Sequence, residues 1–352
     1  MSLVLWVLGG VTACSTAAFL TARLIEWTRA LGVVDTPNAR SSHTRVTPRG
    51  GGLAIVAVVV VAAAGAIAAW PAAARQLLAV ITPAVVVSAV SWFDDIKPLP
   101  NRVRFGVHIA AAAATACLIG PLERIRLGDT MSFDVGVLAW PLTLLWITGM
   151  TNAFNFMDGI DGIAGITAAA AGGAIAAVAL AVSSPAVAAV ALAFAAAALG
   201  FLRSNWPPAR IFMGDVGSAF CGFLIAALPF ALPRDNWPRA VPAVAFTMWP
   251  FIFDATFTLA RRALRRENIF QSHRSHIYQR LVIGGWSHRA VSALYGGLAA
   301  MAATIAAVPF IDPMLRRPCE RAAFATLALG ICLLLGLVRV VERPRNESLE
   351  PV

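Results

Sequence analysis

Long apolar runs separated by short polar segments dominate this chain. Runs of roughly 20 apolar residues have the length that an α-helix needs to cross the hydrocarbon core of a bilayer. The pattern predicts about eleven such helices, centred near residues 12, 60, 85, 112, 145, 172, 194, 222, 250, 300 and 331. We therefore expect an all-α, polytopic integral membrane protein.

Composition agrees with this expectation. Of the 352 residues, 59% are hydrophobic and only 13% are charged, and the mean hydropathy is +0.75. No long linker interrupts the apolar pattern, so residues 1–352 are predicted to form a single integral membrane domain. The segment 160–200 is rich in Ala and Gly, which predicts closely packed helices, because small residues let helix backbones approach in lipid.

The basic residues predict an orientation in the membrane. If the N-terminus lies outside, 20 of the 28 Lys and Arg residues fall on inner loops and the C-terminal tail, and 8 fall on outer loops. The positive-inside rule then favours an N-out, C-in topology. The basic residues form no stripe interleaved with aromatics, so the net charge of +10 does not indicate nucleic-acid binding. The predicted active-site face comprises the inner loops 23–50, 94–103, 155–160, 203–210 and 261–289.

Acidic residues recur where predicted helices meet that inner face. Asp94 and Asp95 are adjacent, Asp158 and Asp161 lie three residues apart, and Asp215 stands between glycines in the segment 207–218. Carboxylates beside membrane segments are costly and by default indicate a functional site. Carboxylate oxygens combined with substrate phosphates are also the ligands that Mg²⁺ prefers.

Each acidic motif also has a purely structural alternative. The adjacent pair is typical of a solvated helix end, and Asp158 and Asp161 would be stabilised by the dipole at a helix N-terminus. Asp215 would cap a helix after a Pro-rich turn. Asp254 precedes Arg261 by seven residues, so an ion pair along one helical face is as good an interpretation as catalysis.

Polar residues near these motifs are candidate substrate ligands. Arginine binds phosphate through a planar fork of donors, histidine and amide side chains hydrogen-bond phosphate or sugar oxygens, and glycine backbone amides after residue 49 suit an anion. Two histidines three apart would need a third ligand for Zn²⁺, and none follows at a ligand spacing. The candidates are Arg49, Arg102, Arg104, Asn152, Asn155, Ser218, His273, Arg274, His276 and Arg280.

Three motifs together resemble one family. The adjacent Asp94 and Asp95, the segment 155–162 and the segment 212–218 are similar, in this order, to the motifs of the polyprenyl-phosphate N-acetylhexosamine-1-phosphate transferases. The resemblance covers most of the chain. It implies transfer of a sugar 1-phosphate from a UDP-sugar to undecaprenyl phosphate in the bacterial cytoplasmic membrane, with Mg²⁺ or Mn²⁺ and release of UMP. It leaves a homodimeric assembly open.

The resemblance also implies roles for the acidic residues. Asp94, Asp95, Asp158 and Asp161 are the expected catalytic residues, and Asp215 is the expected Mg²⁺ ligand, with Asp95 beside it. A single phosphoryl transfer relies mostly on positioning and charge neutralisation. A two-step route through an aspartyl-phosphate is also compatible with these residues, and the sequence does not choose between the routes.

Two departures refine the resemblance. The stretch 273–279 differs from the histidine-rich loop of the muramyl-pentapeptide enzyme and looks like members that begin O-antigen, lipopolysaccharide or other envelope-glycan synthesis. Arg104 and His108 stand where Lys and Gln are expected. The alternatives are phospho-N-acetylmuramoyl-pentapeptide transfer and, from a different class, an ion-coupled transporter, whose site would usually lie near the bilayer midplane.

Overall fold

The computed structural model describes residues 2–37, 45–129, 131–268 and 273–342, so parts of two predicted inner loops, 38–44 and 269–272, lie outside the described residues. Within the described residues the chain forms thirteen α-helices and four short strands. The helices are α1 (Leu3–Ala30), α2 (Leu53–Ala69), α3 (Ala74–Ile96), α4 (Asn101–Ile119), α5 (Ala139–Met157), α6 (Ile163–Ala181), α7 (Pro185–Asn205), α8 (Asp215–Ala227), α9 (Trp237–Thr247), α10 (Trp249–Leu264), α11 (Ile277–Ile283), α12 (His288–Ile311) and α13 (Arg316–Val341).

The prediction of an all-α, multi-pass membrane protein is confirmed. Eight helices of the described chain are long and apolar enough to cross a membrane, or nine if the pair Asp215–Ala231 and Arg234–Thr247, bent by 115°, forms one span. A helix occupies each of the predicted centres. The count of eleven spans is not confirmed, because α2, α8 and α10 have only 17, 13 and 16 residues.

The break before α10 has a local cause. α9 ends at Thr247, and α10 restarts at Trp249 with Pro250 in its first turn. Proline has no backbone N–H and fits the first helical turn, where that donor would have no partner within the helix. The predicted segment centred at residue 250 is therefore the beginning of a helix and not its middle.

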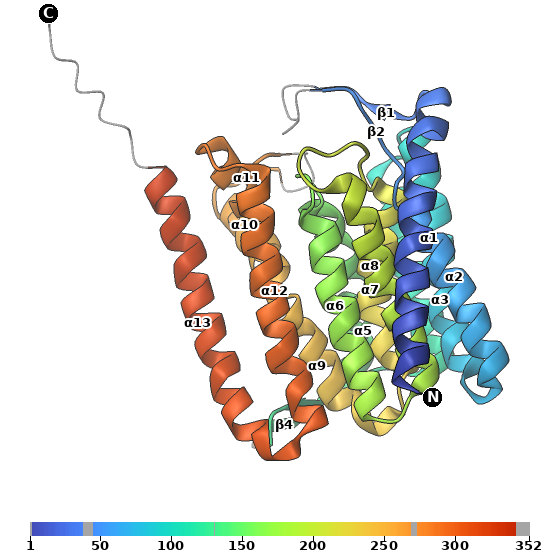
Figure 1. Ribbon diagram of the computed structural model, residues 1–352. Helices are drawn as coiled ribbons and strands as arrows, with labels where there is room; N and C mark the ends of the chain where they lie inside the picture. The colour runs from blue at the N-terminus through green and yellow to red at the C-terminus, as the bar shows by residue number, and fades with distance from the viewer. Residues whose placement is uncertain (1, 38–44, 130, 269–272, 343–352) are drawn as a thin grey trace, which may run out of the picture.

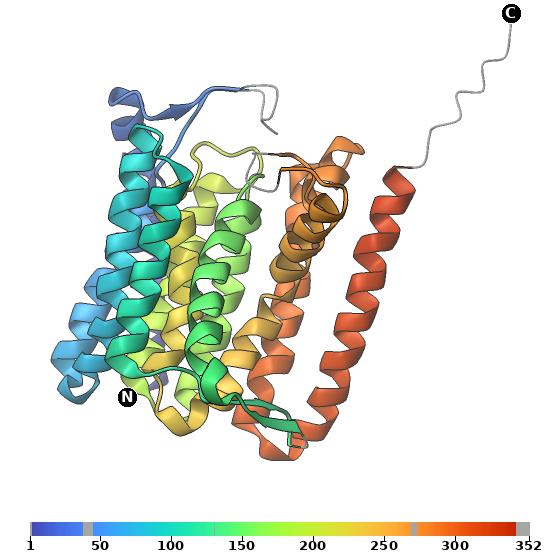
Figure 2. The same cartoon turned by 180° about the vertical axis from the view of Figure 1, so that it is seen from behind.

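The helices run side by side between two ends of the molecule (Figure 1). We call one end the ribbon end, because it carries the antiparallel strands β1 (Val34–Asp35) and β2 (Thr47–Pro48). The opposite, hairpin end carries β3 (Arg124–Leu127) and β4 (Met131–Asp134), as Figure 2 shows from behind. α1 begins at the hairpin end, whereas α13 ends at the ribbon end, so the two described termini lie on opposite sides.

The Ala- and Gly-rich helices form the packed centre, as predicted. α7 packs against α6, α1 and α2. A Cβ atom added at Gly172 of α6 would lie 2.9 Å from the backbone nitrogen of Ala195 in α7, and one added at Gly200 of α7 would lie 2.2 Å from the carbonyl oxygen of Cys14 in α1. Both approaches require glycine, because a Cβ atom there would overlap neighbouring backbone.

The β1–β2 ribbon connects the N-terminal part of the chain to the segment before α8. The backbone nitrogen of Phe212 donates to the carbonyl of Pro48 over 2.8 Å, and those of Gly51 and Gly52 donate to Phe212 and Met213 over 2.9 Å each. These hydrogen bonds fix the start of α2 against the loop that carries Asp215. The sequence pattern predicted neither this ribbon nor the β3–β4 hairpin.

Candidate functional site

Helix ends from distant parts of the sequence meet at the ribbon end. α3 ends with Asp94 and Asp95 in its last turn, α5 carries Asn155 in its last turn, and α8 begins at Asp215. α8 packs against both α3 and α5. The acidic motifs that the sequence placed in separate loops therefore come together around the first turn of α8.

Asp95 anchors the beginning of α8. Its Oδ1 atom accepts a hydrogen bond from the backbone nitrogen of Asp215, and its Oδ2 atom accepts one from that of Val216, both over 3.0 Å. Arg49 from the ribbon reaches Oδ1 over 3.3 Å, and the Asp95 side chain is completely buried. Asp95 thus satisfies two amide donors that a helix start leaves without partners and places the Asp215 carboxylate.

Gly214 makes this anchoring geometrically feasible. Its φ of +76° lies in the left-handed region that favours glycine. A Cβ atom at this position would lie 2.7 Å from Oδ2 of Asp95 and 2.9 Å from the backbone nitrogen of Gly50. The glycine before Asp215 therefore allows α3, α8 and the ribbon to converge.

Arg104 bridges two carboxylates of the cluster. Its NH1 nitrogen lies 2.7 Å from Oδ2 of Asp94 and 2.9 Å from Oδ2 of Asp215, and its NH2 group donates to Asn101 over 2.6 Å. About a third of the Arg104 side chain is exposed, so the guanidinium faces both the carboxylates and the surface. A positive group in this position can neutralise the acids and contact an incoming phosphate.

Asn155 completes the cluster from α5. Its Nδ2 nitrogen donates to Oδ1 of Asp215 over 3.1 Å and to Oγ of Ser218 over 2.9 Å. Asp158 follows three residues later. Its burial, and then the charges of Asp215, Asp95 and Asp161, raise the pKa of the Asp158 carboxyl well above its usual value. The Asp158 carboxyl therefore keeps its proton to a higher pH than an exposed aspartate does.

The oxygen donors of this cluster suit Mg²⁺. That ion keeps several waters and is usually bound by one or two carboxylates together with substrate phosphates. Asp215 is 28% exposed at its side chain, whereas Asp95 is fully enclosed. Among the described residues, no three His, Cys, Asp or Glu side chains group closely enough to hold a metal by themselves. The donor set fits an ion held by Asp215 and completed by phosphate oxygens, and direct ligation by Asp95 stays a prediction.

Asp161 has structural contacts beside the cluster. Its Oδ2 atom accepts from the backbone nitrogen of Ala209 over 2.9 Å, and its Oδ1 atom lies 3.4 Å from Nδ1 of His288. The next residue, Gly162, donates to Asn205 over 2.9 Å. These contacts tie the α5–α6 connection to the loop after α7, and they favour a positioning role for Asp161 over direct catalysis.

The remaining candidates around α4 and α5 differ in their exposure and in their hydrogen-bond partners. Arg102 is exposed on the first turn of α4, apart from the Arg104 bridge. Asn152 donates to the carbonyl of Thr148 within α5 over 2.7 Å and also interacts with the buried His108. Only Arg104 and Asn155 of this group hydrogen-bond the carboxylates directly.

The segment before α11 is held by a buried acid, Asp254 of α10. Its carboxylate accepts hydrogen bonds from the backbone nitrogens of Ile277 and Tyr278 over 2.7 and 3.0 Å, and from the Tyr295 hydroxyl over 2.7 Å. Nδ1 of His276 lies 3.2 Å from the same carboxylate. This arrangement replaces the ion pair with Arg261 that the sequence suggested.

α11 in turn contacts the end of α5 through Tyr278. The Tyr278 hydroxyl donates to the carbonyl of Phe156 over 3.1 Å, next to Asn155. Burial, and then the Asp254 charge, raise the pKa of Tyr278 well above its usual value, so the hydroxyl keeps its proton. A Cβ atom at Gly159 would lie 2.0 Å from that hydroxyl. The loop 273–276 and the Asp158 segment are therefore held in one position relative to each other.

The loop candidates differ in their surroundings. His273 is partly exposed, and its Nδ1 atom lies 2.9 Å from Oγ of Ser275. Burial, and then the charges of His276 and Arg262, lower the pKa of His273 to about 4, so it can hydrogen-bond a ligand but carries no charge near neutral pH. His276 is almost fully buried, and Arg280 pairs with Glu342 at the end of α13.

Sequence reasoning missed Tyr278, Tyr295 and Asn205, and it did not find the partners of Asp254. These four residues hold the site together through contacts with residues distant in the sequence. Asp254 and Tyr295 are 41 positions apart, and Tyr278 and Phe156 are 122 apart. The available signal was weak: a single acid inside an apolar helix, which membrane insertion makes costly.

The Arg104 bridge predicts unequal effects of two substitutions. Arg104→Lys keeps a positive charge between Asp94 and Asp215 and should keep part of the activity. Arg104→Gln leaves these two neighbouring carboxylates without a positive charge between them. We expect Arg104→Gln to lower kcat/KM at least about tenfold more than Arg104→Lys, since hydrogen bonds to charged groups are worth roughly 1.5–3 kcal/mol. Initial rates with Arg75→Gln, at the opposite end, provide the control; equal losses in both Arg104 variants would contradict the bridging role.

The fold and the site define a class of protein: a multi-pass membrane protein with oxygen ligands and guanidinium groups gathered at one end of its helices. Comparison with known proteins specifies the class. Residues 77–232 match the family described as Glycosyl transferase family 4. A Bacillus subtilis protein, "Probable undecaprenyl-phosphate N-acetylglucosaminyl 1-phosphate transferase", is 32% identical over 261 residues, which cover 74% of this chain and 72% of that protein.

Other relatives share parts of that name. A "Decaprenyl-phosphate N-acetylglucosaminephosphotransferase" of Mycolicibacterium smegmatis is 29% identical, covering 96% of this chain and 90% of its own length. A "Phospho-N-acetylmuramoyl-pentapeptide-transferase" of Synechococcus elongatus is 29% identical over 63% of this chain and 64% of that protein. The chain belongs to glycosyl transferase family 4, within the superfamily of polyprenyl-phosphate hexosamine-1-phosphate transferases. It is thus a membrane-embedded phosphosugar transferase.

Proposed function

We propose that this enzyme transfers an N-acetylhexosamine 1-phosphate from a UDP-sugar to undecaprenyl phosphate, giving undecaprenyl-diphosphate-sugar and UMP. The observation that carries the proposal is the cluster at the start of α8, where Asp215 contacts Arg104 and Asn155 and follows the Asp95 anchor. Relatives named as N-acetylglucosaminyl 1-phosphate transferases support the choice of sugar class.

The cluster supplies groups for both phosphates of the donor. Arg104 and Arg49 are each about one-third exposed at their side chains, so their guanidinium groups can contact phosphate oxygens. Bound Mg²⁺ would neutralise charge that develops between the phosphates. Asp215 would hold that ion, and Asn155 orients the Asp215 carboxylate through Oδ1. The protein therefore contributes mainly positioning and electrostatic stabilisation.

The acceptor phosphate needs little activation. A phosphate monoester with a second pKa near ~6 is largely dianionic at neutral pH. One of its oxygens forms a bond to the sugar-bearing phosphorus while the bond from that phosphorus to the UMP oxygen breaks, so no proton has to be removed. This balance requires no strong general base among the aspartates.

The contacts of Asp94 and Asp95 support direct transfer. Oδ1 and Oδ2 of Asp95 accept from backbone amides, and the oxygens of Asp94 accept from Leu99 and Arg104. A nucleophilic carboxylate would have to give up such partners before attacking phosphorus.

Isotope exchange tests this route. A covalent phosphosugar-enzyme would exchange labelled UMP into the UDP-sugar when undecaprenyl phosphate is left out, whereas direct transfer requires the acceptor. We expect the rate of label exchange to be below about 1% of the forward transfer rate. This threshold corresponds to the roughly hundredfold change in rate that one catalytic group typically makes. Exchange at a rate comparable with turnover would show that an aspartyl-phosphate forms.

The loop 273–276 is the proposed contact for the nucleotide-sugar. It is polar, lies at the ribbon end and is connected to the Asn155 segment through Tyr278. A soluble donor arrives from the aqueous side, while the polyprenyl chain reaches the site from the membrane. The proposed orientation places this loop in the cytoplasm, as the distribution of basic residues favours.

This assignment predicts a selective kinetic effect of Arg274→Ala. The apparent KM for the UDP-sugar should rise about tenfold or more, because a charge-assisted phosphate contact is lost, and the KM for undecaprenyl phosphate should stay within about twofold. Arg265→Ala, which removes an exposed arginine at the end of α10, is the matched control. If Arg274→Ala raises the KM for the lipid instead, the loop belongs to the acceptor.

A donor panel tests the proposed function. Purified enzyme with undecaprenyl phosphate and Mg²⁺ should release UMP from a UDP-N-acetylhexosamine, lose activity with EDTA and regain it with Mg²⁺ or Mn²⁺. UDP-N-acetylmuramoyl-pentapeptide belongs in the panel, because one group of relatives carries that specificity in its name. Preference for the pentapeptide donor would replace the proposed role in O-antigen or other envelope-glycan synthesis with a role in peptidoglycan synthesis.

The position of the cluster also favours an enzyme over an ion-coupled transporter. Transporter sites usually lie near the bilayer midplane, whereas Asp94, Asp95 and Asp215 lie at the ends of α3 and α8. Coupled transport would need a path of polar groups through the Ala- and Gly-rich centre, which is closely packed.

A further inference from the structure

A cavity of about 440 Å³ lies at the hairpin end, between the β3–β4 hairpin, α9, α12 and α13. This is the end opposite the carboxylate cluster (Figure 1). The cavity lies next to the end of α12 at Ile311 and the beginning of α13 at Arg316. These two helices have the length and composition of membrane spans, so the cavity is at the level where lipid headgroups meet the hydrocarbon core.

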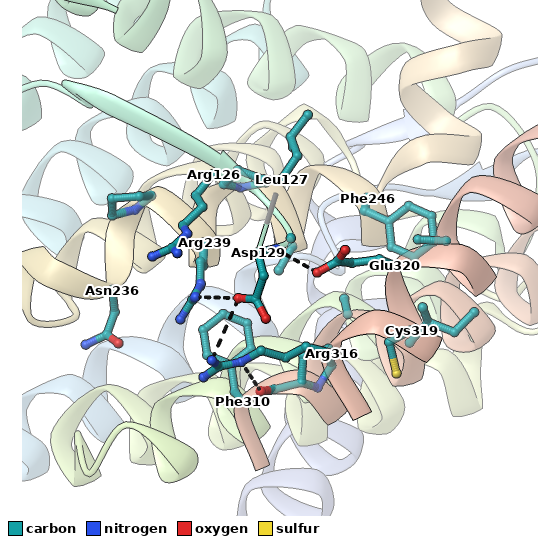
Figure 3. Close-up of a pocket in the computed structure, with 18 of the residues that line it drawn as sticks. Arg126, Leu127, Asp129, Asn236, Arg239, Phe246, Phe310, Arg316, Cys319 and Glu320 are labelled. Carbon is teal, nitrogen blue, oxygen red and sulfur yellow. Dashed lines mark hydrogen bonds and ion pairs between the residues drawn. The ribbon is translucent and has the colours of Figure 1, made fainter. Parts of the chain in front are cut away.

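Two arginines of this cavity reach one carboxylate, and a third arginine lies close to them. NH2 of Arg239 lies 2.9 Å and NH1 of Arg316 lies 3.8 Å from the same Oδ1 atom of Asp129. Arg126 and Arg316 both repel the Arg239 guanidinium electrostatically. Figure 3 shows Arg239 and Arg316 both linked to Asp129, with Arg126 beside Arg239. A single acceptor atom is therefore shared between two cations, and a third cation lies close by.

Arg126 has unused donor capacity. Its Nε atom is buried and has no hydrogen-bond partner within the part of the chain that the structure describes. A buried donor without a partner is unfavourable, so a ligand that accepts a hydrogen bond from it removes that cost. The observation points to an anion next to Arg126.

The other charged groups of the cavity are paired or exposed. Arg124 pairs with Asp134 over 2.7 Å, and Glu320 accepts from the backbone nitrogen of Asp129 over 2.7 Å. Asp235 is exposed on the turn before α9. Among the described residues, neither Glu320 nor Asp235 pairs with Arg126, Arg239 or Arg316, although Nε of Arg316 donates to the carbonyl of Pro309 over 3.4 Å.

Another part of the cavity lining, which we call the apolar wall, consists of apolar side chains. It is formed by Phe246 of α9, Phe310 of α12, and Phe324 and Leu327 of α13. Phe324 is 62% exposed, so the apolar wall continues onto the face of α13 that a bilayer would cover. A ligand that enters from the bilayer can place hydrocarbon along this wall and an anionic headgroup against the arginines.

We propose that this cavity binds the phosphate headgroup of an anionic lipid, with its acyl chains on the apolar wall. Guanidinium groups bind phosphate through several hydrogen-bond donors at once, and the apolar wall favours a lipid over a free phosphate. The site is separate from the carboxylate cluster, so it is a second lipid site and not the place of phosphosugar transfer. Its occupancy would hold the hairpin against α9 and α13.

Lipid retention by the full-length purified protein tests the proposal. In native mass spectrometry, phosphatidylglycerol should be retained more strongly than phosphatidylcholine with the same acyl chains. Arg126→Gln and Arg316→Gln should each weaken phosphatidylglycerol binding about tenfold, the range expected for one charge-assisted hydrogen bond. Arg317→Gln is the matched control, because Arg317 neighbours Arg316 but is exposed and does not line the cavity.

A second variant tests the apolar wall. Ala306→Phe, on the α12 side of the cavity, fills the space for hydrocarbon without removing charge and should also weaken lipid retention, with each variant's thermal midpoint measured alongside. The proposal is overturned by equal retention of the two lipids, by an equal loss in Arg317→Gln, or by inorganic phosphate binding that depends on Arg126 while phosphatidylglycerol binding does not. Each result is independent of transferase activity and so leaves the proposed function untouched.

Discussion

Asp215→Asn is expected to lower turnover by at least about a hundredfold, without unfolding the protein. The amide removes the negative charge that pairs with Arg104 at 2.9 Å and replaces a hard anionic oxygen with a poor Mg²⁺ ligand. Loss of one group that stabilises developing charge typically costs that much in rate. The backbone amide of Asp215 still donates to Asp95, so the start of α8 should keep its position.

The matched control for Asp215→Asn is Asp134→Asn. This change is chemically identical but lies in the exposed hairpin at the opposite end, where Asp134 pairs with Arg124. Turnover, Mg²⁺ dependence and thermal midpoint are measured for both variants. Near-normal turnover and metal dependence in Asp215→Asn would show that the cluster around α8 is not the reaction site.

Asp254→Ala is expected to have the largest effect on stability. The carboxylate is completely buried and accepts hydrogen bonds from the backbone of Ile277 and Tyr278 and from the hydroxyl of Tyr295. Its removal leaves these donors without partners, at a cost of about 1–3 kcal/mol for each group. α11 and the donor loop should loosen together, so both the thermal midpoint and turnover should fall.

Tyr295→Phe separates the contributions of this network. It removes one hydrogen bond to Asp254 and keeps the aromatic ring, so its effect on the thermal midpoint should be much smaller than that of Asp254→Ala. The KM for the UDP-sugar should rise in Asp254→Ala, because the loop 273–276 loses its anchor. A thermal midpoint that stays within about 1 °C of the wild type in Asp254→Ala would contradict the anchoring role, since even 1 kcal/mol shifts a midpoint by several degrees in ordinary domains.

Local sequence patterns were sufficient to find most of the cluster. Asp94, Asp95, Asn155 and Asp215 each stand where an apolar run ends, and such polar residues are informative because a membrane environment makes them costly. The fold class could also be predicted from the sequence, because membrane-spanning helices appear as continuous apolar runs. Those runs did not give the length of each helix, because α8 continues into a bend and α10 restarts at Trp249, with Pro250 in its first turn.

Tertiary contacts explain what the sequence left out. Asp254 looked like one acid on an amphipathic face, yet its partners come from α11 and from Tyr295 of α12. Arg104 looked like one of two equivalent arginines, and only its position beside α8 distinguishes it from Arg102. The cavity at the hairpin end depends on four separate segments, and no local pattern brings Arg126, Arg239 and Arg316 together.

The measurement that tests the central claim most directly is the mass of the lipid product formed from undecaprenyl phosphate and a UDP-N-acetylhexosamine. Transfer of a sugar 1-phosphate predicts a lipid heavier by one N-acetylhexosamine and one phosphate, together with an equimolar amount of UMP. Asp215→Asn should form neither product at an appreciable rate. A lipid heavier by the sugar alone, with UDP released instead of UMP, would contradict the account, because the bond broken would then lie between the sugar and the phosphate.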